Sequence, residues 1–150
     1  MLCLLMHLDG ETFALDTSRV VEVLPLVGLI ETRAASGAVA GLLNYHGQLV
    51  PVVDLAMLMR RRPSVARHST RIAVLLVAEP AGSTLLGLII ERASQLLSAD
   101  KDEFAETGIV SDAPYLGGIK LGPQGTVQLI EPGAILANSR DPVAASPDAA

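Results

Sequence analysis

The sequence predicts an all-β fold arranged in two lobes. Short apolar stretches recur along the chain and are separated by turn residues, as at Asp9-Gly10, Asn44–Gly47 and Gly122–Gly125. Regularly spaced short strands with such turns are typical of a small barrel or sandwich. The same order of features also appears twice along the chain, which indicates two related halves.

The expected strands are aliphatic stretches that end at Gly, Asp, Asn or Pro, residues that turn the chain or interrupt a strand. Hydrophobic residues make up 50% of the chain but aromatic residues only 3%, so we expect a core of Leu, Val, Ile and Ala. On this basis strands are expected over residues 2–8, 12–16, 20–24, 29–32, 39–45, 48–53, 71–78, 85–90, 94–98, 116–121 and 126–130.

Helical segments are expected to be few and short. Asp54 is suited to cap a short helix over Leu55–Met59, because its carboxylate can accept hydrogen bonds from the free amides of the first turn. Pro132 favours the first position of a second helical turn, which would run through Leu136. The polar and acidic residues 100–113 predict a loop that contains a helical turn.

An internal repeat relates the two halves of the chain. The segment Gly41–Leu58 matches Gly117–Ile135 at an offset of about 76 residues. Each begins with Gly, passes through two apolar strands joined by a turn, and reaches an acidic residue, Asp54 or Glu131, before a short helical segment. The repeat therefore predicts two lobes that share one domain.

We expect a single domain over residues 1–137, with lobes at roughly 12–62 and 70–137 and with the N-terminal strand crossing over between them. Residues 138–150 are rich in Ala, Pro, Ser and Asp and offer little apolar surface to bury. Such a composition predicts a disordered tail.

Charge and cysteine content exclude several classes of protein. The net charge of -5 and the pI of about 5.1 argue against a nucleic-acid-binding protein, which would carry a basic surface. A single cysteine, Cys3, allows no intrachain disulfide, which is typical of a reducing compartment. The longest apolar run, Ile72–Ala78, is far shorter than the ~20 residues of a membrane-spanning helix. We therefore expect a cytoplasmic protein without direct membrane insertion.

The chain lacks the motifs of common catalytic and cofactor sites. It has no Gly-rich phosphate loop, no Gly-x-Ser-x-Gly elbow, and no zinc-ligand spacing around His7, His46 or His68. Asp54 and Glu22 are better explained as a helix cap and a surface charge than as a catalytic pair. We predict no catalytic residue, no metal and no cofactor. The alternative, a small-ligand-binding β-barrel or a cryptic enzyme, predicts an enclosed pocket with convergent polar groups.

Five segments in a fixed order carry a resemblance to a known family. They are Phe13–Asp16, Val20–Leu24, Val39–Gly47, Val50–Leu55 and Leu86–Glu91. Together they resemble the CheW-like domain, the coupling module of bacterial chemosensory arrays. The third and fourth segments look like the family's Gly-hydrophobic-Asn-x-Arg-Gly and Val-Pro-Val-hydrophobic-Asp-Leu signatures, and the resemblance covers most of the chain.

The resemblance implies a fold of two five-stranded, SH3-like β-barrels packed around a common core. It also implies a non-catalytic adaptor that binds the regulatory domain of a CheA-type histidine kinase and the cytoplasmic tip of a methyl-accepting chemoreceptor. Such a protein would join membrane receptor arrays through its partners. Carried over by position, the partner-binding candidates are Val20, Glu22, Gly41, Asn44, Tyr45, His46 and Gly47.

The chain departs from the family pattern at His46, where the family usually has Arg. Arg is always charged and offers a rigid fork of donors, whereas His offers at most two. Asn44–Gly47 looks more like the members that serve Wsp-type surface-sensing pathways, which control cyclic-di-GMP synthesis. A third interpretation keeps the fold but makes the chain an inhibitor that competes with another coupling protein for its kinase.

Overall fold

The computed structural model describes residues 1–32, 37–93, 95–108, 113–123 and 125–139. These residues form two five-stranded sheets and a few short helical segments. In chain order the elements are β1 (Leu2–Leu8), β2 (Glu11–Asp16), η1 (Thr17–Arg19), β3 (Val20–Pro25), β4 (Val39–Tyr45), β5 (Gln48–Asp54), α1 (Leu55–Arg60), β6 (Arg71–Glu79), β7 (Gly82–Ile90), β8 (Gln95–Ser98), η2 (Lys101–Glu103), β9 (Leu116–Gly122), β10 (Gly125–Ile130) and α2 (Pro132–Ser139).

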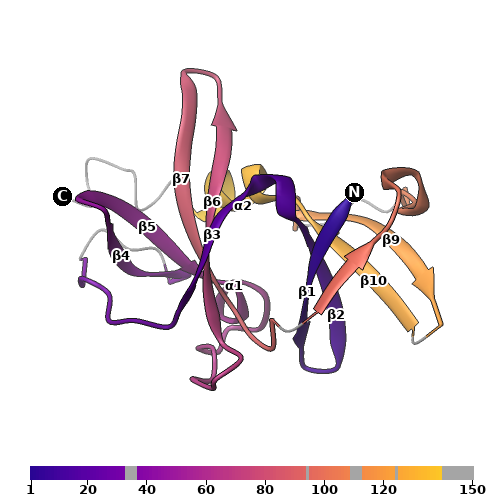
Figure 1. Ribbon diagram of the computed structural model, residues 1–150, viewed down its shortest axis with the longest axis horizontal. Coiled ribbons are helices and arrows are strands. Elements are labelled where there is room, and N and C mark those ends of the chain that lie inside the picture. The colour runs from indigo at the N-terminus through magenta and orange to yellow at the C-terminus, as the bar shows by residue number, and fades with distance from the viewer. Residues whose placement is uncertain (33–36, 94, 109–112, 124, 140–150) are drawn as a thin grey trace.

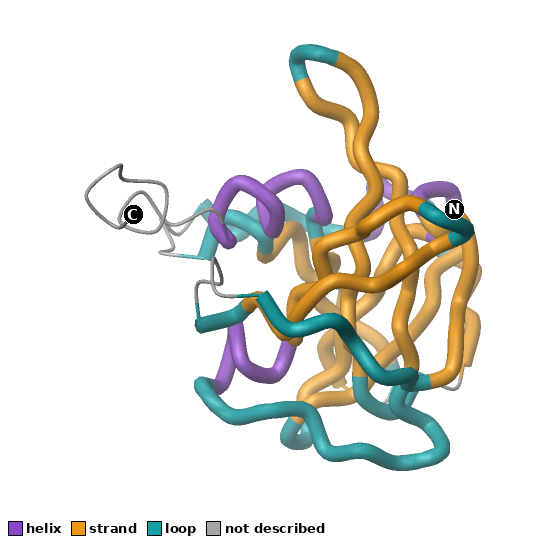
Figure 2. Tube along the Cα trace, turned by 90° about the vertical axis from the view of Figure 1, so that its left-hand side faces the viewer, coloured by secondary structure: helices purple, strands orange, loops and turns teal. Residues whose placement is uncertain are grey.

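The two sheets lie side by side as two lobes (Figure 1). Lobe A has the strand order β8-β1-β2-β10-β9, and lobe B has the order β3-β6-β7-β5-β4. Within each lobe one pair of strands is parallel, β2 with β10 and β5 with β7, and the other pairs are antiparallel. Hairpin β6–β7 is longer than hairpin β1–β2, and its tip projects away from the body of the molecule (Figure 2).

The sheets divide the chain differently from the expected lobes of 12–62 and 70–137. Hairpin β6–β7 lies after residue 70 but pairs with β3 and β5 in lobe B, while hairpin β1–β2 pairs with β8 and β10 in lobe A. Lobe A therefore takes β1 and β2 from before residue 62 and β8, β9 and β10 from after residue 70, whereas lobe B takes β3, β4 and β5 from before residue 62 and β6 and β7 from after residue 70. The exchange depends on the two parallel pairings, which join strands far apart in sequence and leave no local sequence signal.

The core is aliphatic, as the composition predicts. A central cluster joins the two lobes and contains Phe13 and Leu15 of lobe A together with Leu75, Leu86 and Leu88 of lobe B. Two further clusters fill the interiors of the individual barrels. Strand β6 contributes to both kinds of cluster, because its alternate side chains face the central core and the barrel interior. This burial on two faces explains the uninterrupted apolar run in its sequence.

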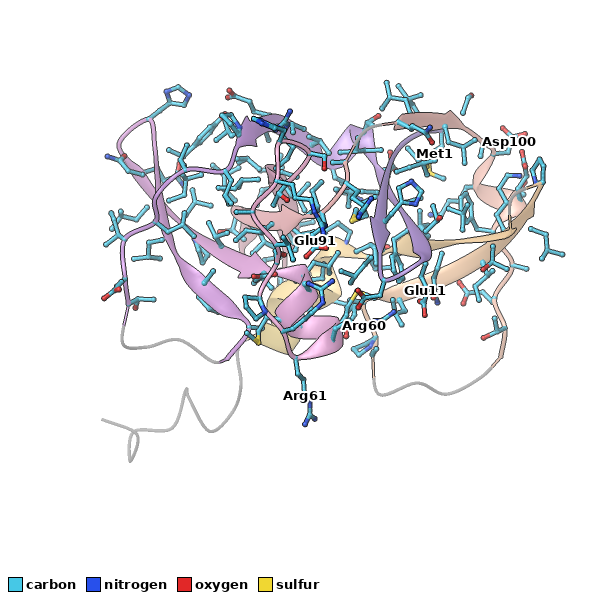
Figure 3. The ribbon with its side chains drawn as sticks, turned by 90° about the horizontal axis from the view of Figure 1, so that it is seen from below. Met1, Glu11, Arg60, Arg61, Glu91 and Asp100 are labelled. Carbon is cyan, nitrogen blue, oxygen red and sulfur yellow. The ribbon has the colours of Figure 1, made fainter. Side chains whose placement is uncertain are left out.

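A network of ion pairs, the interlobe ion network, ties lobe A to lobe B. Arg62 donates to both oxygens of the buried Glu91 carboxylate, at 2.8 and 3.2 Å, and also to Asp9 at 2.8 Å. Arg60 pairs with Glu11 at 3.0 Å and with Asp9 at 3.5 Å, and Figure 3 shows Arg60, Glu11 and Glu91 at this junction. The hydrogen bonds from Arg62 hold the pKa of Asp9 and the pKa of Glu91 below their usual values.

Several local expectations differ from the observed elements. The expected strand 29–32 contributes only a single bridge, between Ile30 and Leu42. Strand β7 begins at Gly82, three residues before its expected start. Helix α2 continues to Ser139, two residues into the expected tail. Residue 94 and residues 140–150 lie outside the described part of the chain, as do residues 109–112 of the expected polar loop.

The N-terminal cap of helix α1 is the one expected from the sequence. Asp54 Oδ1 accepts hydrogen bonds from the amides of Ala56 and Met57 at 3.0 and 3.3 Å, which makes it the N-cap of α1. Ser64 adds two further hydrogen bonds to the same carboxylate. The carboxylate is therefore committed to the cap and to the segment that follows α1, as expected for a structural acid.

Candidate partner-binding face

The candidate residues lie where lobe B closes on itself. Strands β3 and β4 are the two edges of the sheet, and the chain between them returns to β4 through the bridge between Ile30 and Leu42. Both backbone hydrogen bonds of this bridge measure 2.8 Å. The closure brings Glu22 of β3 next to the turn between β4 and β5, although the two positions are distant in sequence.

Glu22, Tyr45 and His46 form one cluster at this closure. The Tyr45 hydroxyl donates a 2.7 Å hydrogen bond to Glu22 Oε1, and His46 Nε2 lies 4.0 Å from the same oxygen. The rings of Tyr45 and His46 pack edge to face, with centroids 4.5 Å apart. The hydrogen bond to Glu22 raises the pKa of Tyr45, so the phenol stays a neutral donor that orients the carboxylate.

Asn44 and Gly47 shape the turn that presents this cluster. The central residues of the turn, His46 and Gly47, have φ angles of +52° and +85°. Positive φ at both central positions is the requirement of a tight type I′ hairpin turn, which favours Gly at the second position. The Asn44 Oδ1 atom accepts a 3.0 Å hydrogen bond from the Gly47 amide. These two residues therefore fix where His46 points.

Gly41 lies beneath Leu29 and Ile30, the closing segment of lobe B, which bridges to β4 at Leu42. It is buried, with a φ of +155°, and a Cβ at this position would lie 2.7 Å from the carbonyl oxygen of Ile30. The absent side chain lets the closing segment approach β4 closely. Gly41 therefore supports the face from below and offers no side chain to a partner.

Val20 lies apart from the cluster. Its side chain is partly buried against the central core, and its backbone pairs with Leu75 of β6. The neighbouring Val21 and Val23 are instead 50% and 41% exposed, and they flank Glu22 on the outer edge of the sheet. The sequence reasoning missed both, because the run from Val20 to Leu24 is apolar at every position except Glu22 and so has no regular polar alternation that marks its outward face.

The described residues offer little for chemistry. They contain no group of three or more His, Cys, Asp or Glu side chains that could hold a metal ion. Neither helix in this part of the chain is long and apolar enough to cross a membrane. A groove of about 650 Å³ lies between the lobes and is open to solvent, and its Asp9 and Glu91 carboxylates are already paired with Arg62.

Comparison with known proteins identifies the family. The CheW-like domain matches residues 2–140 of this chain. The chain belongs to the CheW-like domain family. The chain also resembles the crystal structure of the scaffolding protein TtCheW from Thermoanaerobacter tengcongensis, with a TM-score of 0.74 and 20% sequence identity over 86% of this chain and 82% of that one. A comparison with curated proteins gives no significant match.

Family membership confirms the expected class of function. A CheW-like protein is a non-catalytic coupling adaptor of chemotaxis signalling, and its partners are chemosensory signalling proteins. The two five-stranded sheets match the expected pair of SH3-like barrels. The function of such a protein depends on surfaces that contact other proteins, and the cluster around Glu22 is a candidate for one of them.

Proposed function

We propose that this protein couples a methyl-accepting chemoreceptor to a CheA-type histidine kinase by binding the receptor's cytoplasmic tip and the kinase's regulatory domain. In this role it works in the cytoplasm and joins membrane receptor arrays through its partners. The observation that supports the proposal is the exposed edge of β3, where Val21 and Val23 flank Glu22 beside the turn that carries Tyr45 and His46.

This edge combines the two properties of a reversible protein contact. Val21 and Val23 provide apolar surface whose burial contributes roughly 25 cal/mol per Å² to binding. Glu22 provides a carboxylate that the Tyr45 hydroxyl already holds in place, so less side-chain freedom is lost when a partner donor binds it. Signalling contacts that form and dissociate readily often use small surfaces.

The seven candidate positions take different parts in the proposed contact. Glu22, Tyr45 and His46 present side chains to a partner, and Asn44 and Gly47 hold the turn in shape. Gly41 allows the barrel to close beneath the face, and Val20 anchors β3 to the core. We therefore expect substitutions at the first three residues to change binding without unfolding the protein.

Calorimetry with the kinase's regulatory domain and with a receptor-tip fragment tests the proposal. The double variant Val21→Ser, Val23→Ser removes exposed apolar surface, and we expect at least a tenfold loss of affinity for one of the two partners. Val65→Ser is the matched control, because Val65 is similarly exposed, at 43%, but lies on the segment after α1. Absence of binding to both partners by the unaltered chain would contradict the adaptor role.

His46→Arg tests the role of the turn. Arg restores a permanent charge with several donors next to Glu22. We expect a severalfold gain in affinity for the tip of a chemotaxis receptor, with little change for the kinase domain. Equal affinity of both variants for every receptor tip would remove His46 from the contact. A gain confined to motility receptors would support the assignment of the parent chain to a surface-sensing pathway.

A further inference from the structure

Equivalent positions in the two lobes can be assigned from the barrel closure. Gly41 in lobe B and Gly118 in lobe A each lie beneath a closing segment, and a Cβ would meet Ile30 O at 2.7 Å or Phe104 O at 2.8 Å. Each closing segment makes one bridge to the neighbouring strand, at Leu42 or Ile119. Counting four residues along the strand from each glycine places Gly122 of lobe A where lobe B has Tyr45.

The opposite edge strands can be aligned in the same way. Leu24 of β3 packs on the interior cluster of lobe B, and Leu97 of β8 packs on the interior cluster of lobe A. Two residues before each leucine lie Glu22 and Gln95. Lobe A therefore has Gln95 and Gly122 at the positions where Glu22 and Tyr45 form their hydrogen bond in lobe B.

The exchange of Tyr for Gly leaves the end of lobe A open. A groove of about 500 Å³ lies there between β8 and the β9–β10 hairpin. Its lining includes the apolar side chains of Leu5, Leu97 and Val127, and its polar groups include Gln95, Thr12, His7 and Lys120. In lobe B, Tyr45 packs against the corresponding interior cluster.

We propose that this groove receives a tyrosine side chain from a partner protein, in the position that Tyr45 occupies in lobe B. The proposal rests on the adaptor function proposed above and adds a second contact on the other lobe. The partner's aromatic ring packs on Leu97 and Val127, and its hydroxyl donates to the side-chain carbonyl of Gln95. The neighbouring residues of the partner segment fill the remaining volume of the groove.

The chemistry of the lining favours tyrosine over other side chains. A ring buries a large apolar area while its hydroxyl finds a polar partner, which is why tyrosine is enriched at protein interfaces. A purely aliphatic side chain would cover the amide of Gln95 without pairing it. An acidic side chain would find Lys120 of the lining already paired with Glu103 at 3.0 Å, and the His7 ring already hydrogen-bonded to Thr12 at 3.0 Å.

N-acetyl-tyrosinamide serves as the probe, titrated into isotopically labelled protein and followed by NMR. We expect saturable amide shifts at Gln95, Gly122 and Val127, and none with N-acetyl-alaninamide. Gly122→Tyr fills the groove with an aromatic ring of the protein itself, and we expect it to lower the affinity for the probe at least tenfold. A Cβ at Gly122 has its nearest neighbour at 3.4 Å, so the substitution fits the backbone.

Leu121→Tyr is the matched control, because Leu121 precedes Gly122 on the same strand and is 81% exposed. It is expected to leave the probe affinity within twofold. Should Gly122→Tyr not fold, Gln95→Ala removes the proposed hydroxyl acceptor at an exposed position, with an expected threefold loss. Unsaturable shifts, shifts elsewhere on the protein, or undiminished binding by these variants would overturn the proposal.

Titration with the kinase's regulatory domain and the receptor-tip fragment separates this proposal from the adaptor function. If Gly122→Tyr loses affinity for one of the two partners and Leu121→Tyr does not, the result supports the groove as the docking site for that partner. If both partners bind Gly122→Tyr as tightly as the parent chain, the groove receives neither, and the adaptor function stands without it. If no partner binds the parent chain, the adaptor function fails, whereas the probe alone still decides whether the groove accepts a tyrosine.

Discussion

Lobe B fills the end of its barrel with its own side chains, whereas lobe A leaves the same end open. Both lobes have the same strand order, the same parallel pair and a glycine beneath the closing segment. They differ in the outermost layer, where Tyr45 and Leu85 pack on the interior of lobe B. In lobe A the open groove has Gly122 and Thr12 in its lining.

This difference shows that one backbone plan can carry two kinds of surface. At the closing glycines the contact is between backbone atoms. It is the same in both lobes, because a Cβ on either glycine would obstruct the closing segment. The outer layer concerns side chains only, so it can change without altering the fold. The adaptor can therefore present a preformed polar cluster on one lobe and a groove on the other.

The largest expected effect comes from the closing glycines. We expect Gly41→Ala to lower the free energy of unfolding by roughly 2–5 kcal/mol, because the methyl group meets Ile30 O and the backbone has a positive φ. Gly118→Ala meets the backbone of Phe104 without a positive φ and should cost roughly 1–3 kcal/mol. Urea unfolding measures both.

Gly122→Ala is the control for these two variants, since its new methyl group meets nothing closer than 3.4 Å. We expect its stability to lie within about 1 kcal/mol of the parent chain. If Gly118→Ala were as stable as this control, the two lobes would not close in the same way, and the assignment of equivalent positions would fail.

The second effect concerns the interlobe ion network and its dependence on pH. The pKa values of Asp9 and Glu91 are lowered in the folded protein, chiefly by hydrogen bonds from Arg62. As the pH falls, the unfolded chain therefore binds protons at these carboxylates before the folded protein does. The stabilisation of the folded state by the two carboxylates is complete above their ordinary pKa values, and it is lost as the pH drops through the lowered values. Arg62→Met should have a lower free energy of unfolding at neutral pH than the parent chain. Its free energy of unfolding should also fall less steeply as the pH is lowered.

Arg61→Met is the control for this experiment. Arg61 has a φ of +56° at the end of α1, and Figure 3 shows its side chain directed away from the body of the protein. Its replacement should leave the unfolding free energy and its slope against pH unchanged. Identical pH slopes for the parent chain and Arg62→Met would show that the ion pairs do not hold the lobes together.

A smaller effect is expected at Glu22. The chain has two tyrosines, and the pKa of each is raised, that of Tyr45 by its hydrogen bond to Glu22 and that of Tyr115 by burial. Glu22→Gln removes the negative charge, so the pKa of Tyr45 should move back toward its ordinary value. Alkaline titration of tyrosinate absorbance measures the shift, with Tyr45→Phe used to assign the steps. If the pKa of Tyr45 is the same in Glu22→Gln as in the parent chain, Tyr45 and Glu22 do not form the hydrogen bond that distinguishes the end of lobe B from the end of lobe A.

The smallest effect is expected at Leu121. This side chain is 81% exposed, so Leu121→Ser removes almost no buried surface. The unfolding free energy should change by less than about 0.5 kcal/mol. A larger loss in chemical denaturation would mean that Leu121 packs on another part of the protein, and Leu121→Tyr would then be unsuitable as a control for the groove.

Much of the local structure could be predicted from the sequence, because its causes lie within a few residues. The turn at Asn44–Gly47 follows from residues that accept positive φ, and the cap of α1 follows from the short carboxylate of Asp54. The aliphatic core follows from composition. The repeat of two strands, an acid and a helix is also present in the structure, at β4–β5–α1 and at β9–β10–α2, although the structure aligns Gly41 with Gly118 and not with the expected Gly117.

The candidate face was only partly predictable. Family resemblance indicated Glu22, Tyr45 and His46, which the fold brings together, but it gave no sign that Gly41 lies buried beneath the closing segment. Val21 and Val23 could not be recognised as exposed, since the run from Val20 to Leu24 is apolar on both faces of the strand and no polar alternation marks the outward one.

The sequence by itself determined ten of the eleven expected strands, the turns between them, the cap of α1 and the existence of two related halves. Only the tertiary structure decided which hairpin joins which half, where the barrels close, and which lobe is left with an open groove. The physical reason is the range of the interactions. Propensities and turn preferences act between neighbours in the chain, whereas parallel pairing of β2 with β10 and of β5 with β7 joins residues that approach only when the whole core has formed.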